Sequence, residues 1–291
     1  MSHLSNIGTV KDILSRHGFT FSKKLGQNFL INPSVCPRMA EMGGAAPGVG
    51  VLEVGPGIGV LTYELAQRAD KVVAIELDDR LLPVLDETLG DFDNVTIIHG
   101  DVLKIDLPAV IREEFQGLDV VVCANLPYYI TSPIVMGLLE AKLPIRAITV
   151  MVQKEAAARI CAAPGSREAG ALSAAVSYYA DPQVLFGVSR GSFMPAPDVD
   201  SAVIRLNIRP QPAVSPRDEA LFFRVIKAGF SQRRKTLMNS LTSGVALSKV
   251  QLAQALELSG IKATARAEEL TLEDFCRLSD QIGALMNGEA E

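Results

Sequence analysis

The first two thirds of the chain contain short apolar runs, rich in Val, Ile and Leu, that alternate with stretches of mixed polarity. Apolar runs of about four to eight residues are typical of buried β-strands, and the stretches between them have the spacing of helices. Strands that alternate with helices form right-handed β-α-β units around a parallel sheet. We therefore predict an α/β fold with strands at residues 51–54, 71–76, 95–99, 118–124 and 147–152 and a closing strand at 202–208.

The pattern changes near residue 210. The segment Arg209-Pro210-Gln211-Pro212 has the composition of a linker. Beyond it the apolar residues keep only helical spacing, Ser248 begins a capping-box pattern, and Thr271 is placed to cap the last helix. We therefore predict two domains, the first α/β and the second small and all-helical. Their predicted bounds are residues 1–208 and residues 209–291.

Four of the predicted strands end at, or run directly into, a residue with distinctive chemistry. In a parallel sheet the carboxyl ends of the strands lie at one edge, and ligands bind there. The sequence thus predicts a single ligand-binding edge, to which each of these strands contributes. The residues concerned are Gly55, Glu76, Asp101 and Asn125.

The first strand runs into a glycine-rich turn, Glu53-Val54-Gly55-Pro56-Gly57-Ile58-Gly59, that opens a helix. Its spacing is G-x-G-x-G, which differs from the G-x-G-x-x-G of dinucleotide-binding turns. The turn also contains no basic side chain to neutralise phosphates. We interpret Gly55 and Gly57 as a backbone platform for an adenosyl ligand without a pyrophosphate. The alternative is a tight turn that binds nothing.

Two carboxylates follow at later strand ends. Glu76 lies about 21 residues after Gly55, a distance at which an acidic residue reaches the hydroxyls of a ribose. A carboxylate is a suitable acceptor for two hydroxyl donors. Asp101 ends the next strand and is a candidate acceptor for the adenine amine of the same ligand. A solvated strand-end charge at Glu76 and an ordinary Gly-Asp turn at Asp101 are the alternatives.

The tetrapeptide Asn125-Leu126-Pro127-Tyr128 is the most specific motif of the chain. A base amine is a weak nucleophile because its lone pair is delocalised into the ring. The Asn125 side-chain oxygen and the Leu126 carbonyl can accept its two N–H groups, while Pro127 fixes the backbone that presents them. Tyr128 offers an aromatic face, and base stacking contributes roughly 1–3 kcal/mol. This chemistry predicts methyl transfer to an adenine nitrogen.

A second aromatic residue is a candidate for the opposite wall of that base pocket. Phe193 begins a predicted rigid loop, residues 193–201, that contains Pro195 and Pro197. The alternative is a hydrophobic contact beneath a rigid loop, and the residues alone leave both interpretations open.

The net charge of −5 disfavours nucleic-acid binding only if charge is averaged over the chain. Residues 205–240 carry a local charge of +6 and residues 11–38 one of +4, and local fields steer a polyanion. Within the first region Arg233, Arg234 and Lys235 are adjacent, and we predict that they lie on a helix and contact RNA phosphates. A solvated helix face is the alternative.

Several functional classes are disfavoured. No apolar run reaches membrane-spanning length and no leader pattern opens the chain, so we expect a cytoplasmic protein without a membrane partner. The cysteines are scattered, without a C-x-x-C pair or histidine spacing, so we expect no metal site and no disulfide framework. The cysteines are Cys36, Cys123, Cys161 and Cys276.

Taken together, these motifs resemble the ribosomal RNA adenine N6,N6-dimethyltransferases, most closely the bacterial small-subunit enzymes. The resemblance covers nearly the whole chain. One departure is Met238, where a basic residue often follows the preceding basic run. The matching segments are residues 24–30, 53–59, 76, 100–101, 125–128, 193–201, 230–237 and 268–275.

The resemblance implies a fold, a methyl donor and roles for residues. The fold is a class I methyltransferase (Rossmann-like) domain with a small helical domain, and the donor is S-adenosylmethionine. Asn125 and Leu126 match the amine-binding positions, and Tyr128 and Phe193 match the base-stacking positions. The donor-binding positions are Asn28, Leu30, Gly55, Glu76, Asp101 and Asn125, to which the backbone platform of the turn adds Gly57.

The implied activity is dimethylation of two adjacent adenines in the 3′-terminal hairpin loop of 16S rRNA, within the immature 30S subunit. We expect the enzyme to act as a monomer. The sequence leaves three alternatives: a macrolide-resistance methylase of 23S rRNA, a non-catalytic assembly or transcription factor of the same fold, and a nicotinamide oxidoreductase.

Overall fold

The computed structural model describes residues 3–20 and 27–288 and divides into two compact units. The first comprises residues 1–157 and 182–208, and the second comprises residues 158–181 and 209–291. We describe each unit by itself.

A seven-stranded sheet forms the centre of the first unit, in the order β4-β3-β2-β5-β6-β9-β7. The strands from β4 to β6 pair in parallel, as the alternating pattern predicted, and β9 pairs antiparallel with β6. The inner strands are buried on both faces, which explains their continuous apolar runs. Their bounds are β2 Val49–Val54, β3 Lys71–Glu76, β4 Val95–His99, β5 Asp119–Asn125, β6 Ile145–Gln153, β7 Ala180–Val188 and β9 Ser201–Ile208.

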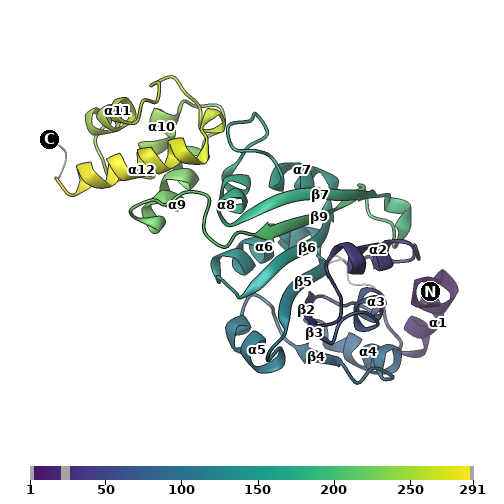
Figure 1. Ribbon diagram of the computed structural model, residues 1–291. Helices are drawn as coiled ribbons and strands as arrows, with labels where there is room; N and C mark the ends of the chain where they lie inside the picture. The colour runs from purple at the N-terminus through teal and green to yellow at the C-terminus, as the bar shows by residue number, and fades with distance from the viewer. Residues whose placement is uncertain (1–2, 21–26, 289–291) are drawn as a thin grey trace. The chain divides into compact units, whose positions relative to one another are not determined.

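Helices cover both faces of this sheet (Figure 1). In that view α2, α3 and α4 lie on one side of the strands and α5 and α6 on the other. Pro83 falls in the first turn of α4, where a proline is tolerated because its missing N–H has no partner there. The bounds are α1 Ile7–Arg16, α2 Val35–Met42, α3 Val60–Ala66, α4 Leu82–Leu89, α5 Leu107–Glu114, α6 Thr131–Glu140 and α7 Lys154–Ile160.

A second, two-stranded sheet joins distant parts of the first unit. β1 (Phe29–Leu30) pairs antiparallel with β8 (Phe193–Met194), so that Leu30 lies opposite Phe193. The backbone N–H of Ile31 donates to the Ser192 carbonyl at 2.8 Å and extends this pairing. The segment predicted as a rigid loop therefore begins with a strand, and its Met194–Pro195 peptide bond is cis.

The second unit consists of helices, and α9 to α12 group together in Figure 1. Two of its helices begin at the predicted caps: the side chains of Ser248 and Thr271 accept from the third backbone N–H of α11 and α12. The bounds are α8 Ala171–Tyr179, α9 Glu219–Gly229, α10 Leu237–Leu241, α11 Lys249–Leu258 and α12 Leu272–Met286.

The division into units differs from the predicted domains in one respect. The segment 158–181, predicted to belong to the α/β domain, packs with the helices that follow residue 208. Aromatic contacts are the reason: the ring of Tyr178 lies 5.3 Å from Phe222, and the ring of Tyr179 is stacked on Phe223 at 5.6 Å. Both tyrosine hydroxyls also donate to the Glu219 carboxylate.

Candidate active site

A cleft at the carboxyl ends of β2, β3, β4 and β5 brings the predicted site residues of the first unit together. These residues come from four strand ends, from β1 with its preceding residue, and from β8, so the cleft depends on both sheets. Each of the following residues lines it: Asn28, Leu30, Gly55, Gly57, Glu76, Asp101, Asn125, Leu126, Pro127, Tyr128 and Phe193.

The glycine turn supplies the floor of the cleft. Gly55 and Gly57 have φ values of +69° and +63°, in the left-handed region that favours glycine. A Cβ built on Gly55 would meet no atom within 4 Å, so the cleft is open directly above this backbone. The turn thus provides a bare backbone surface that a ligand can approach closely.

Glu76 ends β3 and is 6% exposed. One carboxylate oxygen accepts from the Asp78 backbone N–H at 2.8 Å, and the other accepts from the Gly57 N–H at 3.3 Å. Burial raises the pKa of Glu76 above its ordinary value, and these backbone hydrogen bonds oppose that rise. The carboxylate is therefore oriented by two separate loops before any ligand binds.

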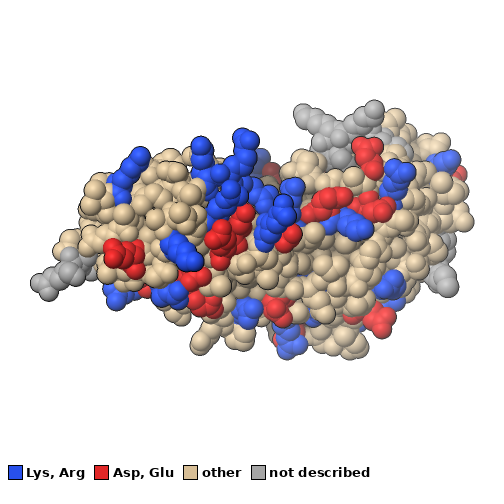
Figure 2. All heavy atoms as spheres, turned by 90° about the horizontal axis from the view of Figure 1, so that it is seen from above, with Lys and Arg blue, Asp and Glu red and all other residues tan. Residues whose placement is uncertain are grey.

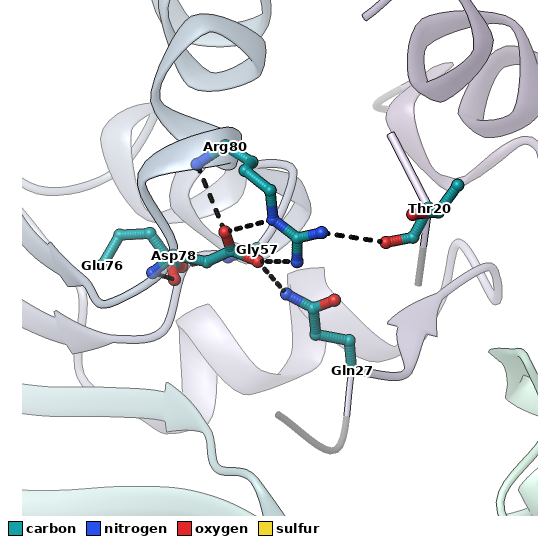
Figure 3. A network of polar contacts seen from close by, with 6 residues as sticks. All are labelled: Thr20, Gln27, Gly57, Glu76, Asp78 and Arg80. Atoms are coloured by element: carbon teal, nitrogen blue, oxygen red, sulfur yellow. Dashed lines mark hydrogen bonds and ion pairs between the residues drawn. The ribbon is translucent and has the colours of Figure 1, made fainter. Parts of the chain in front are cut away.

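The loop after β3 contains a polar network that the sequence patterns did not predict (Figure 3). The Asp78 carboxylate accepts from Arg80 Nε at 2.8 Å and Arg80 Nη2 at 2.6 Å, and from Gln27 Nε2 at 2.7 Å. Arg80 is the main reason that the pKa of Asp78 lies below its ordinary value. The Arg80 guanidinium also lies over the Phe19 ring, 5.0 Å from its centre. The network links segments that are about fifty residues apart.

At the end of β5 the tetrapeptide presents two hydrogen-bonding groups to the cleft. The Leu126 N–H donates to the Met151 carbonyl at 3.3 Å, and the Thr131 hydroxyl donates to the Pro127 carbonyl at 3.3 Å. Within residues 3–20 and 27–288, no hydrogen bond engages the Asn125 side chain or the Leu126 carbonyl. Both groups are thus available to an incoming amine.

Aromatic side chains contribute two walls. Tyr128 lies in a short 3-10 helix, and its hydroxyl shares a 2.6 Å hydrogen bond with the Ser201 hydroxyl at the start of β9. Burial raises the pKa of Tyr128, and the hydrogen bond with Ser201 opposes that rise. Phe193 is 3% exposed and is positioned by the pairing of β8 with β1. The two rings therefore come from segments that lie 65 residues apart in the printed sequence.

The remaining predicted ligand positions occupy the ends of the cleft. The Asp101 carboxylate accepts from the Leu103 backbone N–H at 3.0 Å and lies 3.4 Å from the Lys104 amine, which leaves it partly engaged by its own turn. Asn28 and Leu30 enter the cleft through β1, and the residues just before Gln27 lie outside the described range.

Glu53 also lines the cleft, although the sequence patterns assigned it no role. It is 1% exposed, and one of its carboxylate oxygens has no hydrogen-bond partner within the described part of the chain. Burial raises its pKa to about 8. A carboxyl group embedded in an otherwise apolar strand, directly before a glycine turn, was the signal that could have identified it.

In the second unit the basic cluster is exposed. The prediction that it lies on a helix was wrong. α9 ends at Gly229, and Arg233, Arg234 and Lys235 form a turn before α10. The turn is closed by a hydrogen bond from the Lys235 N–H to the Gln232 carbonyl at 2.9 Å. In the described residues, no acidic side chain forms an ion pair with these three cations.

Charged side chains are unevenly distributed over the surface. The face drawn in Figure 2 carries Lys and Arg side chains in groups, interspersed with Asp and Glu. Over residues 3–20 and 27–288, no helix has the length and apolarity needed to cross a membrane. Within that part of the chain, no group of three or more His, Cys, Asp and Glu is arranged to hold a metal ion.

The chain closely resembles curated bacterial proteins over almost its entire length. It is 50% identical over 276 residues to the ribosomal RNA small subunit methyltransferase A of Bacillus licheniformis, with 94% of each chain covered. It is likewise 50% identical over 282 residues to the protein of that name from Geobacillus kaustophilus, with 96% of each covered.

Solved structures of methyltransferases have the same fold. The 23S rRNA methyltransferase ErmE is 28% identical, has a TM-score of 0.66, and covers 88% of this chain and 100% of its own. A dimethyladenosine transferase from Plasmodium falciparum has a TM-score of 0.71 at 24% identity, covering 89% of this chain and 98% of its own, and supports the fold alone. A family model described as ribosomal RNA adenine dimethylase matches residues 18–283. The protein therefore belongs to the ribosomal RNA adenine dimethylase family and is a methyltransferase with a Rossmann-like catalytic fold.

Proposed function

We propose that this protein transfers methyl groups from S-adenosylmethionine to N6 of two adjacent adenines in the 3′-terminal hairpin loop of 16S rRNA. It dimethylates each adenine, as a monomer, on the immature small subunit in the cytoplasm. One observation carries the proposal: the two unengaged amine acceptors, at Asn125 and Leu126, line the same cleft that suits an adenosyl ligand. Identity of about 50% to small-subunit methyltransferases supports the choice of substrate.

The residues of the cleft fit the methyl donor. Glu76 offers oriented carboxylate oxygens to ribose hydroxyls, and the bare backbone at Gly55 leaves room for the ligand. The unpartnered oxygen of Glu53 suits a cationic donor, because a buried carboxylate is stabilised by an opposite charge. In this proposal Asn28, Leu30, Gly57 and Asp101 complete the donor site.

The tetrapeptide Asn125–Tyr128, at the end of β5, acts on the acceptor amine. When bound, S-adenosylmethionine would supply a methyl group activated by its positively charged sulfur, and the amine lone pair would displace the thioether from that methyl carbon. Asn125 and Leu126 hold the two amine hydrogens, which directs the lone pair toward the methyl carbon. Tyr128 and Phe193 enclose the base, and the released proton passes to solvent. Orientation and electrostatic fit provide most of the rate enhancement.

The second unit contributes RNA affinity. In this proposal the turn formed by Arg233, Arg234 and Lys235 contacts phosphates, since its cations are exposed and have no acidic partner in the described residues. Phosphate contacts position a nucleic acid without reading its sequence, so the choice of adenine rests on the cleft.

A second candidate is methylation of 23S rRNA, because the ErmE structure covers nearly the whole chain. Its identity of 28% is well below the 50% shared with the small-subunit proteins. Both activities would use the same cleft chemistry, so only the identity of the modified RNA separates them.

The decisive experiment supplies labelled S-adenosylmethionine together with undermethylated 30S subunits or with 50S subunits. We expect N6,N6-dimethyladenosine in 16S rRNA, identified by nucleoside mass analysis and located by primer extension. Label in 23S rRNA alone would contradict the proposed substrate.

The matched variant is Asn125→Ala, which removes one amine acceptor. We predict that it lowers methylation at least about a hundredfold while RNA binding persists, because hydrogen bonds that orient a reacting group act in the transition state. Asn207→Ala, on β9 and outside the cleft lining, is the control for loss of an asparagine. Unchanged turnover in Asn125→Ala would refute the assignment of the cleft.

A further inference from the structure

The Asp78 carboxylate holds together two segments that border the cleft from different parts of the sequence. Its side chain is 4% exposed and forms an ion pair with Arg80 at 2.6 Å. The same oxygen that contacts Arg80 Nη2 also accepts from Gln27 Nε2 at 2.7 Å. Figure 3 shows the Gln27 side-chain amide directed at this carboxylate, with the Arg80 guanidinium beside it.

Each of the two segments carries part of the proposed donor site. Gln27 directly precedes Asn28 and the β1 strand that places Leu30 in the cleft. On the other side, the Asp78 backbone N–H donates to one oxygen of Glu76, and the Gly57 N–H donates to the other. A displacement of Asp78 therefore changes both the position of β1 and the orientation of Glu76.

The carboxylate is already saturated by protein donors. It accepts from two side-chain nitrogens and the backbone N–H of Arg80 as well as from Gln27. Arg80 lowers its pKa, so it stays ionised near neutral pH. Such a group has no remaining capacity for a ligand, and its influence must pass through the residues that it holds.

We propose that Asp78 is a positioning residue for the methyl donor: through Gln27 and its own backbone N–H it sets the separation between the Asn28–Leu30 side and the Glu76 side of the cleft. The inference rests on the proposed function, because it takes the cleft as the donor site. Pre-set geometry increases affinity by removing the ordering that the ligand would otherwise impose.

The test compares two variants of the full-length protein. Gln27→Met keeps the length of the side chain but removes the donor to Asp78. Gln27→Lys returns an N–H donor at the same position and leaves the ion pair of Asp78 with Arg80 in place. We expect Gln27→Met to weaken S-adenosylmethionine binding by about tenfold or more, and Gln27→Lys to bind within about threefold of the wild type.

The kinetic readout separates positioning from chemistry. At saturating S-adenosylmethionine we expect Gln27→Met to retain the wild-type kcat on undermethylated small subunits while its KM for the donor rises. The control is Glu64→Gln, which removes another buried carboxylate paired with an arginine, at 2.8 Å from Arg68 but outside the cleft lining. It is expected to lower the Tm of the ligand-free protein without changing donor affinity.

Three results would overturn the inference. They are unchanged donor affinity in Gln27→Met, a Gln27→Lys variant that binds as weakly as Gln27→Met, and a loss in Glu64→Gln equal to that in Gln27→Met. If the wild-type protein binds S-adenosylmethionine and methylates RNA in the same assays, such a result contradicts only the role of Asp78. A wild type that does neither would instead refute the proposed function.

Discussion

Glu53 and Asp78 are both buried carboxyl groups of the same unit, yet their surroundings shift their pKa values in opposite directions. Asp78 has the Arg80 guanidinium beside it, which lowers its pKa. Glu53 has no such cation, and burial raises its pKa to about 8. Asp78 is thus a fixed, ionised anchor, whereas Glu53 is a buried acid whose ionisation an opposite charge would favour.

The raised pKa of Glu53 predicts a specific dependence of stability on pH. Between the ordinary value of 4.5 and about 8 the folded protein retains a proton that the unfolded chain has lost. The contribution of Glu53 to folding stability is therefore fully present below the lower pKa and is lost as pH rises through the higher one. We predict that the wild type loses more thermal stability than Glu53→Gln between about pH 5 and pH 9.

Differential scanning calorimetry of both proteins across this range measures the difference in Tm, and other titrating groups cancel in the comparison. Equal pH dependence in the two proteins would show that Glu53 is ionised in the folded state. The experiment is done without ligand, because a bound cation would lower the pKa of the same group.

Among the elements, the turn between β2 and α3 combines a left-handed backbone with a close contact. Gly57 has a φ of +63°, and a Cβ at this position would lie 3.2 Å from the ring of Phe29 in β1. We predict that Gly57→Ala costs about 1–2 kcal/mol of stability through the left-handed backbone alone. It should also weaken S-adenosylmethionine binding, because the added methyl group displaces β1 or the turn.

Gly18→Ala is the matched control. Gly18 has a φ of +60°, but a Cβ there would meet no atom within 4 Å, and the residue does not line the cleft. We expect a similar loss in free energy of unfolding, measured with urea, and unchanged donor affinity by calorimetry. Equal donor affinity in both variants would contradict a role for the turn in binding.

Sequence patterns predicted the elements whose formation depends on residues that are neighbours in the chain. The strand that ends at Asn125 and the glycine turn were both readable from the sequence, because buried parallel strands are continuous apolar runs. The β1–β8 pairing was not readable, since two-residue strands separated by more than 160 positions leave no periodic signal. That pairing nevertheless positions Leu30 and Phe193 in the cleft.

At the scale of the whole molecule, a net charge of −5 coexists with an exposed basic turn in the second unit. We predict that replacing Arg233, Arg234 and Lys235 by alanine weakens binding to small subunits and lowers the slope of log affinity against log salt by roughly 2 to 3. The donor affinity should not change, because the cleft lies entirely within the first unit.

The control for this variant replaces Lys249 and Lys262 by alanine, which removes two other exposed cations of the second unit. Binding of labelled small subunits on filters at several salt concentrations provides both slopes. If the control lowers the slope as much per cation as the triple variant, general charge accounts for the affinity and the turn has no special role.

Local sequence patterns were enough to predict the alternation of strands and helices, the sheet edge that lines the cleft, and the tetrapeptide at the end of β5, because each depends on neighbouring residues. Three other features became visible only in the folded chain: segment 158–181 packs with the helical unit, the basic run forms a turn, and Gln27 contacts Asp78. The physical reason is that packing and charge pairing depend on which distant groups become neighbours, and short-range patterns do not record that choice.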